Sequence, residues 1–403
     1  MSTIFQNTEI DEEGSAPEVT EPFNPKSISI DTKPMVVQSI VTRLQQATIR
    51  LAPSFQRKEI WGIDQKSKLI ESILLNIPLP MFYVAADERG SLDVVDGMQR
   101  LSALRDFMFE GGDIRNKPNG NGFRLQNLEF IRELNGCTFS ELDVYYQNRI
   151  IEATLSFTII NPGTPEDVKF TIFSRVNTGG MPLTEQEVRH ALYNGKSTNL
   201  LAELAESEIL KSVIGPIFGH ERMEDREFIL RMLAFLIRNP SLYPGKGSRM
   251  ADYLSETMLI INAMPDFKLP RFKKLFKDGG DVASFSVKTT DALRVFFIKG
   301  MKRAHKLFGD HAFRRSLPGN HKRRLNKSLF ETWGCLLAQI SPENFKEILD
   351  KKDVFFSLYE KLLEKTKFRD SVSRHALFPE MVRYRFDKIS ELISFFNGET
   401  SDK

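Results

Sequence analysis

Apolar residues recur along the chain with two different spacings, and the change between them divides it into two parts. Between residues 36 and 160, helical stretches at 36–49 and 64–74 alternate with apolar runs at 81–85, 92–95 and 150–160 that are typical of strands. From residue 197 onward the spacing is close to 3.6, as in Phe228, Leu230, Leu233, Phe235 and Leu236. The pattern predicts an α+β domain followed by an all-helical domain.

Composition sets the outer boundaries of these domains. Residues 1–34 are acidic, rich in Ser, Thr, Pro and Glu, and poor in large apolar side chains. Such a segment cannot offset the entropy of folding, so we expect a disordered tail. Residues 35–196 then form the α+β domain, and residues 197–403 form the helical domain.

The sequence lacks the features of membrane and disulfide-bonded proteins. No apolar run reaches the roughly 18 residues of a membrane span, and no basic region followed by an apolar one opens the chain. We therefore expect a cytoplasmic protein with no membrane contact. Cys137 and Cys335 form no Cys-x-x-Cys pair, which favours buried thiols over a disulfide or a zinc site.

Charge is distributed unevenly between the two halves. Residues 1–200 hold 20 Lys/Arg against 26 Asp/Glu, whereas residues 201–403 hold 36 against 27. Between residues 268 and 327 there are 17 Lys/Arg against 4 Asp/Glu. We expect this stretch to form one basic face that contacts DNA phosphates, although solvated helix faces are the alternative. Its candidate DNA-binding residues are Arg314, Arg315, Lys322, Arg323 and Arg324.

The sharpest local motif is Asp96-Gly97-Met98-Gln99-Arg100, where an apolar run meets a predicted helix. A helix amino terminus offers unpaired N–H groups, glycine lets an anion approach the backbone, and Arg100 adds a fork of donors. Asp96 would repel a phosphate unless Mg²⁺ bridged the two. The motif therefore indicates a metal–nucleotide site with Asp96 as the metal ligand, although Asp-Gly is also a common turn signal.

Several ordered segments accompany this motif. Phe55-Gln56-Arg57 is followed by Trp61, a helix ends in Ile77-Pro78-Leu79-Pro80, and Asn177-Thr178-Gly179-Gly180 precedes Leu183-Thr184. Together they resemble the amino-terminal domain family of GmrSD-type restriction endonucleases, whose signature Asp-Gly-Gln-Gln-Arg differs here only at Met98. Asn326-Lys327-Ser328-Leu329-Phe330-Glu331 and Val382-Arg383-Tyr384-Arg385-Phe386 resemble stand-alone members, so the likeness covers about residues 36–395.

The resemblance implies a ParB/sulfiredoxin-like fold that binds nucleotide phosphates. It assigns Asp96, Gly97, Gln99 and Arg100 to the phosphate site, with Asp96 and Arg100 as candidate catalytic residues, and places Gln56 and Arg57 in the same cleft. The nucleotide would be GTP, UTP or ATP. Met98 cannot supply the hydrogen bonds of a glutamine, so either its side chain enters the core or nucleotide specificity or hydrolysis is altered.

Other residues of the resemblance admit two interpretations. Asn177, with Arg175, is a candidate nucleotide-binding residue, but an Asn before Thr-Gly-Gly is also a helix stop. Gln56, Arg57 and Trp61 could read a modified base, while the alternative places Trp61 in the core and Arg57 in a surface ion pair.

A nuclease motif is missing. The His-Asn-His unit of full-length restriction enzymes needs two neighbouring histidines, and only Arg374-His375 faintly resembles its first half. We expect a component that binds and hydrolyses a nucleoside triphosphate and acts on DNA, including modified phage DNA, with a separately encoded nuclease. The alternatives are a nucleotide-switched DNA-binding or regulatory module without turnover, and an interaction protein with a vestigial site; a homo-oligomer stays open.

Overall fold

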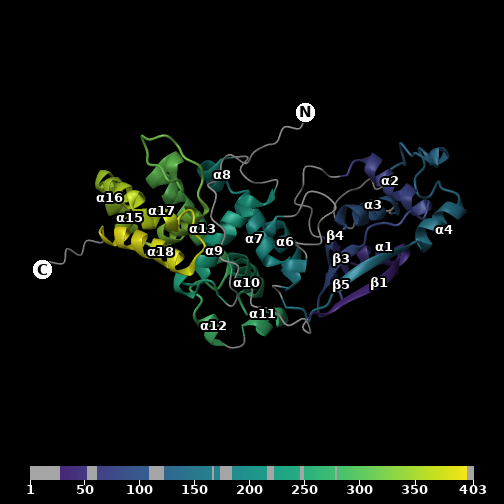
Figure 1. The fold of residues 1–403 in the computed structure, drawn as a ribbon, viewed down its shortest axis with the longest axis horizontal. Helices are drawn as coiled ribbons and strands as arrows, with labels where there is room; N and C mark the ends of the chain where they lie inside the picture. The colour runs from purple at the N-terminus through teal and green to yellow at the C-terminus, as the bar shows by residue number, and fades with distance from the viewer. Residues whose placement is uncertain are drawn as a thin grey trace. The chain divides into compact units, whose positions relative to one another are not determined.

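The chain forms two compact units, Pro22–Leu192 and Tyr193–Lys403, called here the N-terminal and C-terminal units (Figure 1). The computed structural model describes residues 28–51, 61–108, 122–165, 168–172, 184–215, 222–245, 249–276 and 279–396. The first unit is α+β and the second is helical in its described residues, so the predicted fold class is confirmed. The units meet at 192/193, close to the predicted boundary at 196/197.

A mixed five-stranded sheet organises the N-terminal unit, with the strand order β1-β5-β3-β4-β2. β1 pairs antiparallel with β5, β5 runs parallel to β3, β3 and β4 form an antiparallel hairpin, and β2 runs parallel to β4. The hairpin therefore lies inside the sheet, with β4 as the strand that leads into the 96–100 motif. The strands are β1 (Ile30–Val36), β2 (Ile49–Leu51), β3 (Phe82–Ala86), β4 (Leu92–Asp96) and β5 (Thr154–Ile160).

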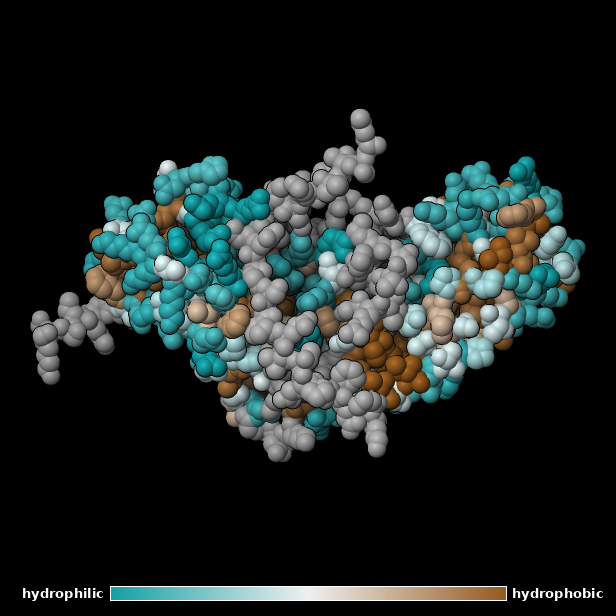
Figure 2. Space-filling model, viewed as in Figure 1, coloured by the Kyte–Doolittle hydropathy of each residue, from teal (hydrophilic) through white to brown (hydrophobic). Residues whose placement is uncertain are grey.

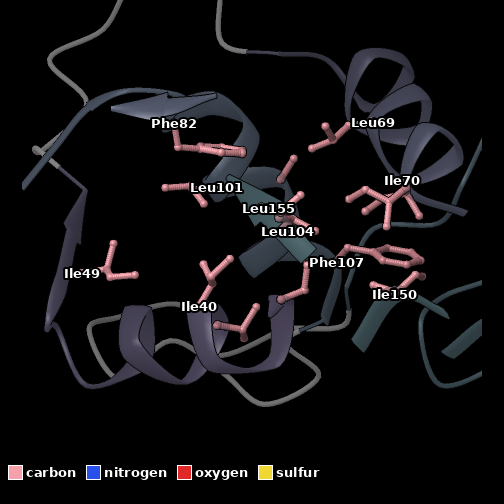
Figure 3. Close-up of a cluster of buried hydrophobic side chains, with 14 of the residues drawn as sticks. Ile40, Ile49, Leu69, Ile70, Phe82, Leu101, Leu104, Phe107, Ile150 and Leu155 are labelled. Atoms are coloured by element: carbon pink, nitrogen blue, oxygen red, sulfur yellow. The ribbon is translucent and has the colours of Figure 1, made fainter. Parts of the chain in front are cut away.

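Helices and strands of this unit share one apolar core (Figure 3). Ile40, Ile70, Leu104 and Ile150, each from a different helix, belong to the same buried cluster as Leu155 of β5. All four helical side chains have no exposed surface, so the periodic apolar residues do form the buried faces predicted for them. The helices are α1 (Val37–Gln45), α2 (Ile63–Leu74), α3 (Met98–Met108), η2 (Arg132–Leu134), α4 (Val144–Glu152) and α6 (Glu185–Leu192).

A buried carboxylate fixes the segment that precedes η2. Glu71 of α2 is 4% exposed and accepts hydrogen bonds from the backbone N–H groups of Glu129, Phe130 and Ile131, at N–O distances of 3.1, 2.7 and 3.0 Å. Burial alone would raise the pKa of Glu71, but these N–H groups and nearby Lys68 hold it below its ordinary value. The ionised side chain thus ties α2 to a loop about 60 residues later in the sequence.

Three predictions for this unit are wrong. The expected tail 1–34 includes residues 30–34, which lie in β1 and pair with β5. The expected helix 36–49 ends at Gln45, and Ile49 begins β2. The expected strand 150–160 begins at Thr154, because residues 150–152 complete α4. Each error falls where a strand depends on a partner that is distant in the sequence.

The C-terminal unit is built around three long helices, α9, α13 and α14, which pack against one another. Gly300 of α13 and Gly334 of α14 let the two helices approach closely, since a Cβ atom at Gly300 would lie 2.5 Å from the Gly334 carbonyl oxygen. The helices of this unit are α7 (Lys196–Ala205), α8 (Glu208–Ile214), α9 (Glu224–Ile237), η4 (Pro240–Leu242), α10 (Met250–Ala263), α11 (Pro270–Leu275), α12 (Gly279–Ala283), α13 (Thr290–Phe308), η5 (Gly309–His311), α14 (Lys327–Gln339), α15 (Pro342–Asp350), α16 (Lys352–Glu364), α17 (Thr366–Ser371) and α18 (Pro379–Ser394).

A buried ionic network connects α9, α14 and α18. The Glu331 carboxylate accepts from Arg231 Nε at 2.6 Å and also pairs with Arg385, and none of the three side chains is more than 2% exposed. Arg385 donates in addition to the backbone oxygens of Ser371 and Ala376. The two C-terminal segments singled out in the sequence therefore meet through Glu331 and Arg385, in the interior of the unit.

The described part of the chain contains no helix that is both long and apolar enough to cross a lipid bilayer.

Candidate functional site

The predicted strand, turn and helix around residue 96 are present. β4 ends at Asp96, Gly97 turns the chain with φ +93°, and α3 begins at Met98. The bond from Leu101 N to Gly97 O opens the helix, so the N–H groups of Met98, Gln99 and Arg100 precede the first intrahelical bond. This end of α3 thus has the polarity that favours an anion.

Gly97 is required by two independent constraints. Its positive φ disfavours other residues, and a Cβ atom there would lie 2.3 Å from Cδ1 of Phe82. Phe82 is fully buried on β3 and stacks on Phe157 of β5, with ring centroids 5.0 Å apart, so it cannot move aside cheaply. Gly97 is therefore needed for the fold itself, in addition to any role in binding a ligand.

Arg100 is more buried, and makes more contacts within the protein, than the sequence predicts. Its Nη2 atom donates to Asp96 Oδ2 at 3.1 Å and to Met81 O at 3.2 Å, and Nη1 donates to Pro80 O. The guanidinium lies 4.2 Å from the Phe82 ring centroid, and the side chain is 11% exposed. Burial lowers the pKa of Arg100, and neighbouring Asp96 opposes that shift. Several donors of the expected phosphate fork are thus used within the protein.

Asp96 is the more accessible member of this pair. Its side chain is 33% exposed, and Arg100 contacts its Oδ2 atom. No group of three or more His, Cys, Asp or Glu side chains among the described residues could hold a metal. A single accessible carboxylate fits Mg²⁺ that is held mainly by phosphate oxygens and water, which is how this ion commonly binds with nucleotides.

The surroundings of Gln99, Met98 and Trp61 bear on two alternatives that the sequence left open. These are whether Met98 lies in the core or faces the nucleotide, and whether Trp61 lies in the core or faces a base. Gln99 Oε1 accepts from Trp61 N at 3.4 Å, which brings the beginning of the described segment 61–108 to the first turn of α3. Met98 and Trp61 are both partly buried and pack against the apolar core. The core interpretation therefore holds for both side chains. Gln56, Arg57, Arg175 and Asn177 lie outside the described residues, so their assignment stays a prediction.

Buried polar residues on α6 adjoin this region and were not identified from the sequence as candidates. α6 packs against β4, and its Gln186, Arg189 and His190 side chains are at most 1% exposed. Arg189 Nε donates to Gln186 Oε1 at 2.9 Å. Thr184 and Glu187 form the predicted capping box, with Thr184 N bonded to Glu187 Oε2 and Glu187 N bonded to Thr184 Oγ1. Polar composition made α6 resemble an exposed helix, and only its packing reveals the burial.

Three cations of the basic stretch 268–327 are used for contacts within the helical unit. Arg294 pairs with Glu203 and Asp291, and Lys327 pairs with Glu227. Arg303 donates to two backbone carbonyls at the end of α14 and the loop after it. These cations stabilise the helical fold, so the prediction of a single basic surface is wrong for this part of the stretch.

Arg314 also differs from its prediction. It is 7% exposed, its Nε donates to Asp310 O, and its Nη1 donates to Arg323 O at 2.8 Å. Arg314 forms an isolated β-bridge with Leu325, so it holds the two ends of the 312–326 loop together. It is thus a framework residue for the other candidate DNA-binding residues of the loop.

The other candidate DNA-binding residues, Arg315, Lys322, Arg323 and Arg324, line one cavity. A cavity of about 710 Å³ lies between the 312–326 loop and the segment from α16 to the residue after α17. On the face shown in Figure 2, hydrophilic residues gather over α17 and the adjoining loop. The loop side contributes Arg315, Ser316, Leu317, Asn320, His321, Lys322, Arg323 and Arg324, and the helical side contributes Glu360, Leu363, Glu364, Arg369 and Val372.

The structure also describes the two cysteines and His375. Cys335 is buried, and burial raises the pKa of its thiol; Cys137 is partly buried, and both are free cysteines. His375 lies in the turn between α17 and α18, with its ring against Phe378 at a centroid distance of 5.3 Å.

Comparison with known proteins identifies one part of the chain. Residues 38–194 match the family described as the GmrSD restriction endonuclease, N-terminal domain, as the sequence motifs predicted. No curated protein and no solved structure matches the chain, so the ParB/sulfiredoxin likeness stays an expectation. The matched residues contain the whole of the 96–100 motif and end at the beginning of the C-terminal unit.

Proposed function

We propose, from the premise that residues 38–194 carry a GmrSD restriction endonuclease N-terminal domain, that this chain is the nucleotide-binding component of a DNA restriction system. The observation that supports it best is the coincidence of the family match with the β4–Gly97–α3 unit. There an accessible carboxylate, a left-handed glycine and a helix amino terminus follow one another within three residues. This is chemistry suited to the phosphates of a Mg²⁺-bound nucleoside triphosphate.

The proposed role of each residue follows from its position. The N–H groups at the beginning of α3 bind phosphate oxygens, Asp96 is the protein's ligand for Mg²⁺, and Gln99 lines the site. Bound Mg²⁺ would neutralise phosphate charge. Arg100 orients Asp96 through their hydrogen bond and leaves fewer donors for the ligand than the sequence alone implied. Gln56, Arg57 and Asn177 are proposed as further binding residues from the resemblance.

Calorimetry with GTP, UTP and ATP tests this site, because Mg²⁺ dependence separates the roles of Asp96 and the backbone. Asp96→Asn should weaken binding about tenfold or more in Mg²⁺ but not in EDTA. Asp143→Asn is a matched control, since Asp143 caps α4 and asparagine caps helices equally well. Absence of nucleotide binding by the wild-type chain, or equal Mg²⁺-dependent affinity for Asp96→Asn, would contradict the proposal.

Turnover distinguishes the proposed enzyme from its nearest rival. A triphosphatase that acts on DNA should release phosphate, with the rate changed by DNA. A nucleotide-switched module would bind nucleotide and release none. We propose that the chain hydrolyses the nucleotide and acts with a separately encoded nuclease. If no triphosphate yields phosphate, the function is that of a nucleotide-switched module instead.

DNA contact is proposed for the cations of the 312–326 loop that line the cavity. Replacement of Arg315, Lys322, Arg323 and Arg324 by alanine removes donors to about as many phosphates. The slope of log affinity against log salt should then fall by roughly three to four. An unchanged slope, measured with one duplex across a salt series, would show that these charges are only solvated.

A further inference from the structure

The cavity beside the 312–326 loop has two chemically different walls. The loop wall carries Arg315, Lys322, Arg323 and Arg324, while α16 presents Glu360 and Glu364, one turn apart, with Leu363 between them. Arg369 of α17 adds another cation, and the half-buried Leu363 adds apolar surface. One cavity thus offers cationic, anionic and apolar groups together.

The opposite charges around this cavity are kept apart. Within the described ranges, no ion pair joins Glu360 or Glu364 to Lys322, Arg323 or Arg324. Elsewhere in the same basic stretch, arginine does reach glutamate, as in the 2.5 Å contact between Arg294 Nε and Glu203 Oε1. The cavity therefore suits a ligand that has an anion at one end and hydrogen-bond donors at the other.

The loop that carries the cations is held in place by its own bonds. Ser316 Oγ lies 2.9 Å from His311 Nδ1 and accepts from Arg323 N at 3.2 Å. Arg314 Nη1 donates to Arg323 O on the other side of the loop, and Asn326 N donates to Phe313 O. Such a preorganised wall loses little entropy when it binds a ligand.

We propose that this cavity binds an unpaired nucleotide of a DNA strand whose base carries an exocyclic amino group. This inference rests on the proposed function, because it names how the chain engages DNA. The phosphate lies against the cations of the loop wall, and the amino group of the base donates to Glu360 or Glu364. The apolar surface of Leu363 faces the ring. A volume of about 710 Å³ is ample for one nucleotide.

The carboxylates distinguish this site from a simple track for phosphates. Two glutamates beside a phosphate path would only repel it, whereas a carboxylate accepts well from the cytosine N4 amino group. Thymine instead presents one N–H between two carbonyl oxygens, which a carboxylate disfavours. A stacked and paired base cannot enter a cavity of this size, so the base must leave the duplex to lie between both walls.

Fluorescence anisotropy with labelled oligo(dC) and oligo(dT) single strands tests the inference in the full chain. Wild-type protein should bind oligo(dC) at least about fivefold more tightly than oligo(dT). Combined Glu360→Gln and Glu364→Gln should remove that preference, while combined Lys322→Ala and Arg324→Ala should weaken both complexes. Glu380→Gln is the control for the glutamates because Glu380 is exposed on α18, and combined Lys302→Ala and Lys306→Ala, exposed on α13, is the control for the cations.

Three results would overturn the inference: equal binding of both oligonucleotides by the wild-type chain, a preference that survives the glutamate substitutions, or an equal gain for both strands in the glutamate variant. The last would mean that the carboxylates merely repel DNA. Nucleotide calorimetry at the Asp96 site, run on the same samples, separates such a failure from a failure of the proposed function. Absence of a base preference in the wild-type chain, together with intact Mg²⁺-dependent nucleotide binding, would overturn the inference alone.

Discussion

Arg100 illustrates how a side chain that resembles a ligand group becomes part of the framework. It joins Asp96 at the end of β4 to the carbonyls of Pro80 and Met81 at the entrance to β3, and it covers the Phe82 ring. The motif residue and the strand before it are therefore coupled. Loss of nucleotide binding in an Arg100 variant is not evidence of phosphate contact unless the fold is intact.

We predict that Arg100→Ala lowers the free energy of unfolding by about 2–3 kcal/mol, because a largely buried charged donor and its acceptors lose one another. Urea denaturation of the full chain measures this change. Arg105→Ala on the same helix, where the arginine is exposed and pairs with Asp106, should cost at most about 1 kcal/mol. Equal effects of the two substitutions would show that the buried contacts of Arg100 contribute little.

A separate prediction concerns Met98, whose partly buried side chain packs against the core. Met98→Gln should reduce stability by about 1–2 kcal/mol, because an amide replaces a thioether on an apolar surface. Nucleotide affinity should stay unchanged when measured by calorimetry under conditions where the variant is folded. A gain in affinity or in phosphate release would mean that position 98 faces the ligand.

At the scale of elements, Glu71 couples α2 to the loop that contains residues 129–131. Its pKa lies below the ordinary value of 4.5, so the carboxylate stabilises the folded state fully above that pH. This stabilisation is lost as the pH falls from about 4.5 through the lower folded pKa. Acid should therefore weaken the attachment of this loop.

We predict that Glu71→Gln lowers stability at neutral pH by about 1–2 kcal/mol and flattens the loss of stability below pH 4.5. Thermal unfolding of wild type and variant across a pH series checks both parts. Glu129→Gln is the control, because Glu129 is exposed and its side chain pairs with Lys68 at the surface. A variant with the wild-type pH profile would show that Glu71 is not the titrating group.

Elements with local signals could be predicted from the sequence, and elements with distant partners could not. The hairpin and the helix after Asp96 were predicted correctly because their apolar spacing, the turn and Gly97 lie within 30 residues. β1 is not predicted because Lys33 and Pro34 are typical of loops. Only their pairing with β5 shows that they lie in a strand. At the site, the motif was found, but the contact of Arg100 with Met81 depends on the place of β3 beside β4.

At the scale of the whole molecule, a region that matches the GmrSD N-terminal domain family is followed by a helical unit whose cations serve two purposes. Arg294, Arg303 and Lys327 are used in packing, whereas the accessible loop cations surround a cavity. A count of charge along the sequence cannot separate these uses, because the difference depends on which helices lie opposite. The basic stretch is therefore informative about partners only after the fold is known.

We predict that the purified chain does not cut DNA. With Mg²⁺ or Mn²⁺ and GTP it should leave modified phage DNA intact in gel assays, because His375 lies on a turn against Phe378 without a paired histidine in the described segments nearby. Addition of a partner nuclease should restore cleavage. Degradation by the chain alone that His375→Ala abolishes would make the C-terminal unit the nuclease.

The buried network of Arg231, Glu331 and Arg385 has a consequence for the history of the sequence. Glu331 lies between the two arginines, so its loss would leave two buried guanidinium groups without this carboxylate, at a cost of about 3–5 kcal/mol. Replacement of Glu331 and Arg385 alone by apolar residues would still remove the carboxylate from the buried Arg231. Selection therefore acts on the three residues together. Among descendants of a common ancestor, positions 231, 331 and 385 should be inherited together or exchanged together.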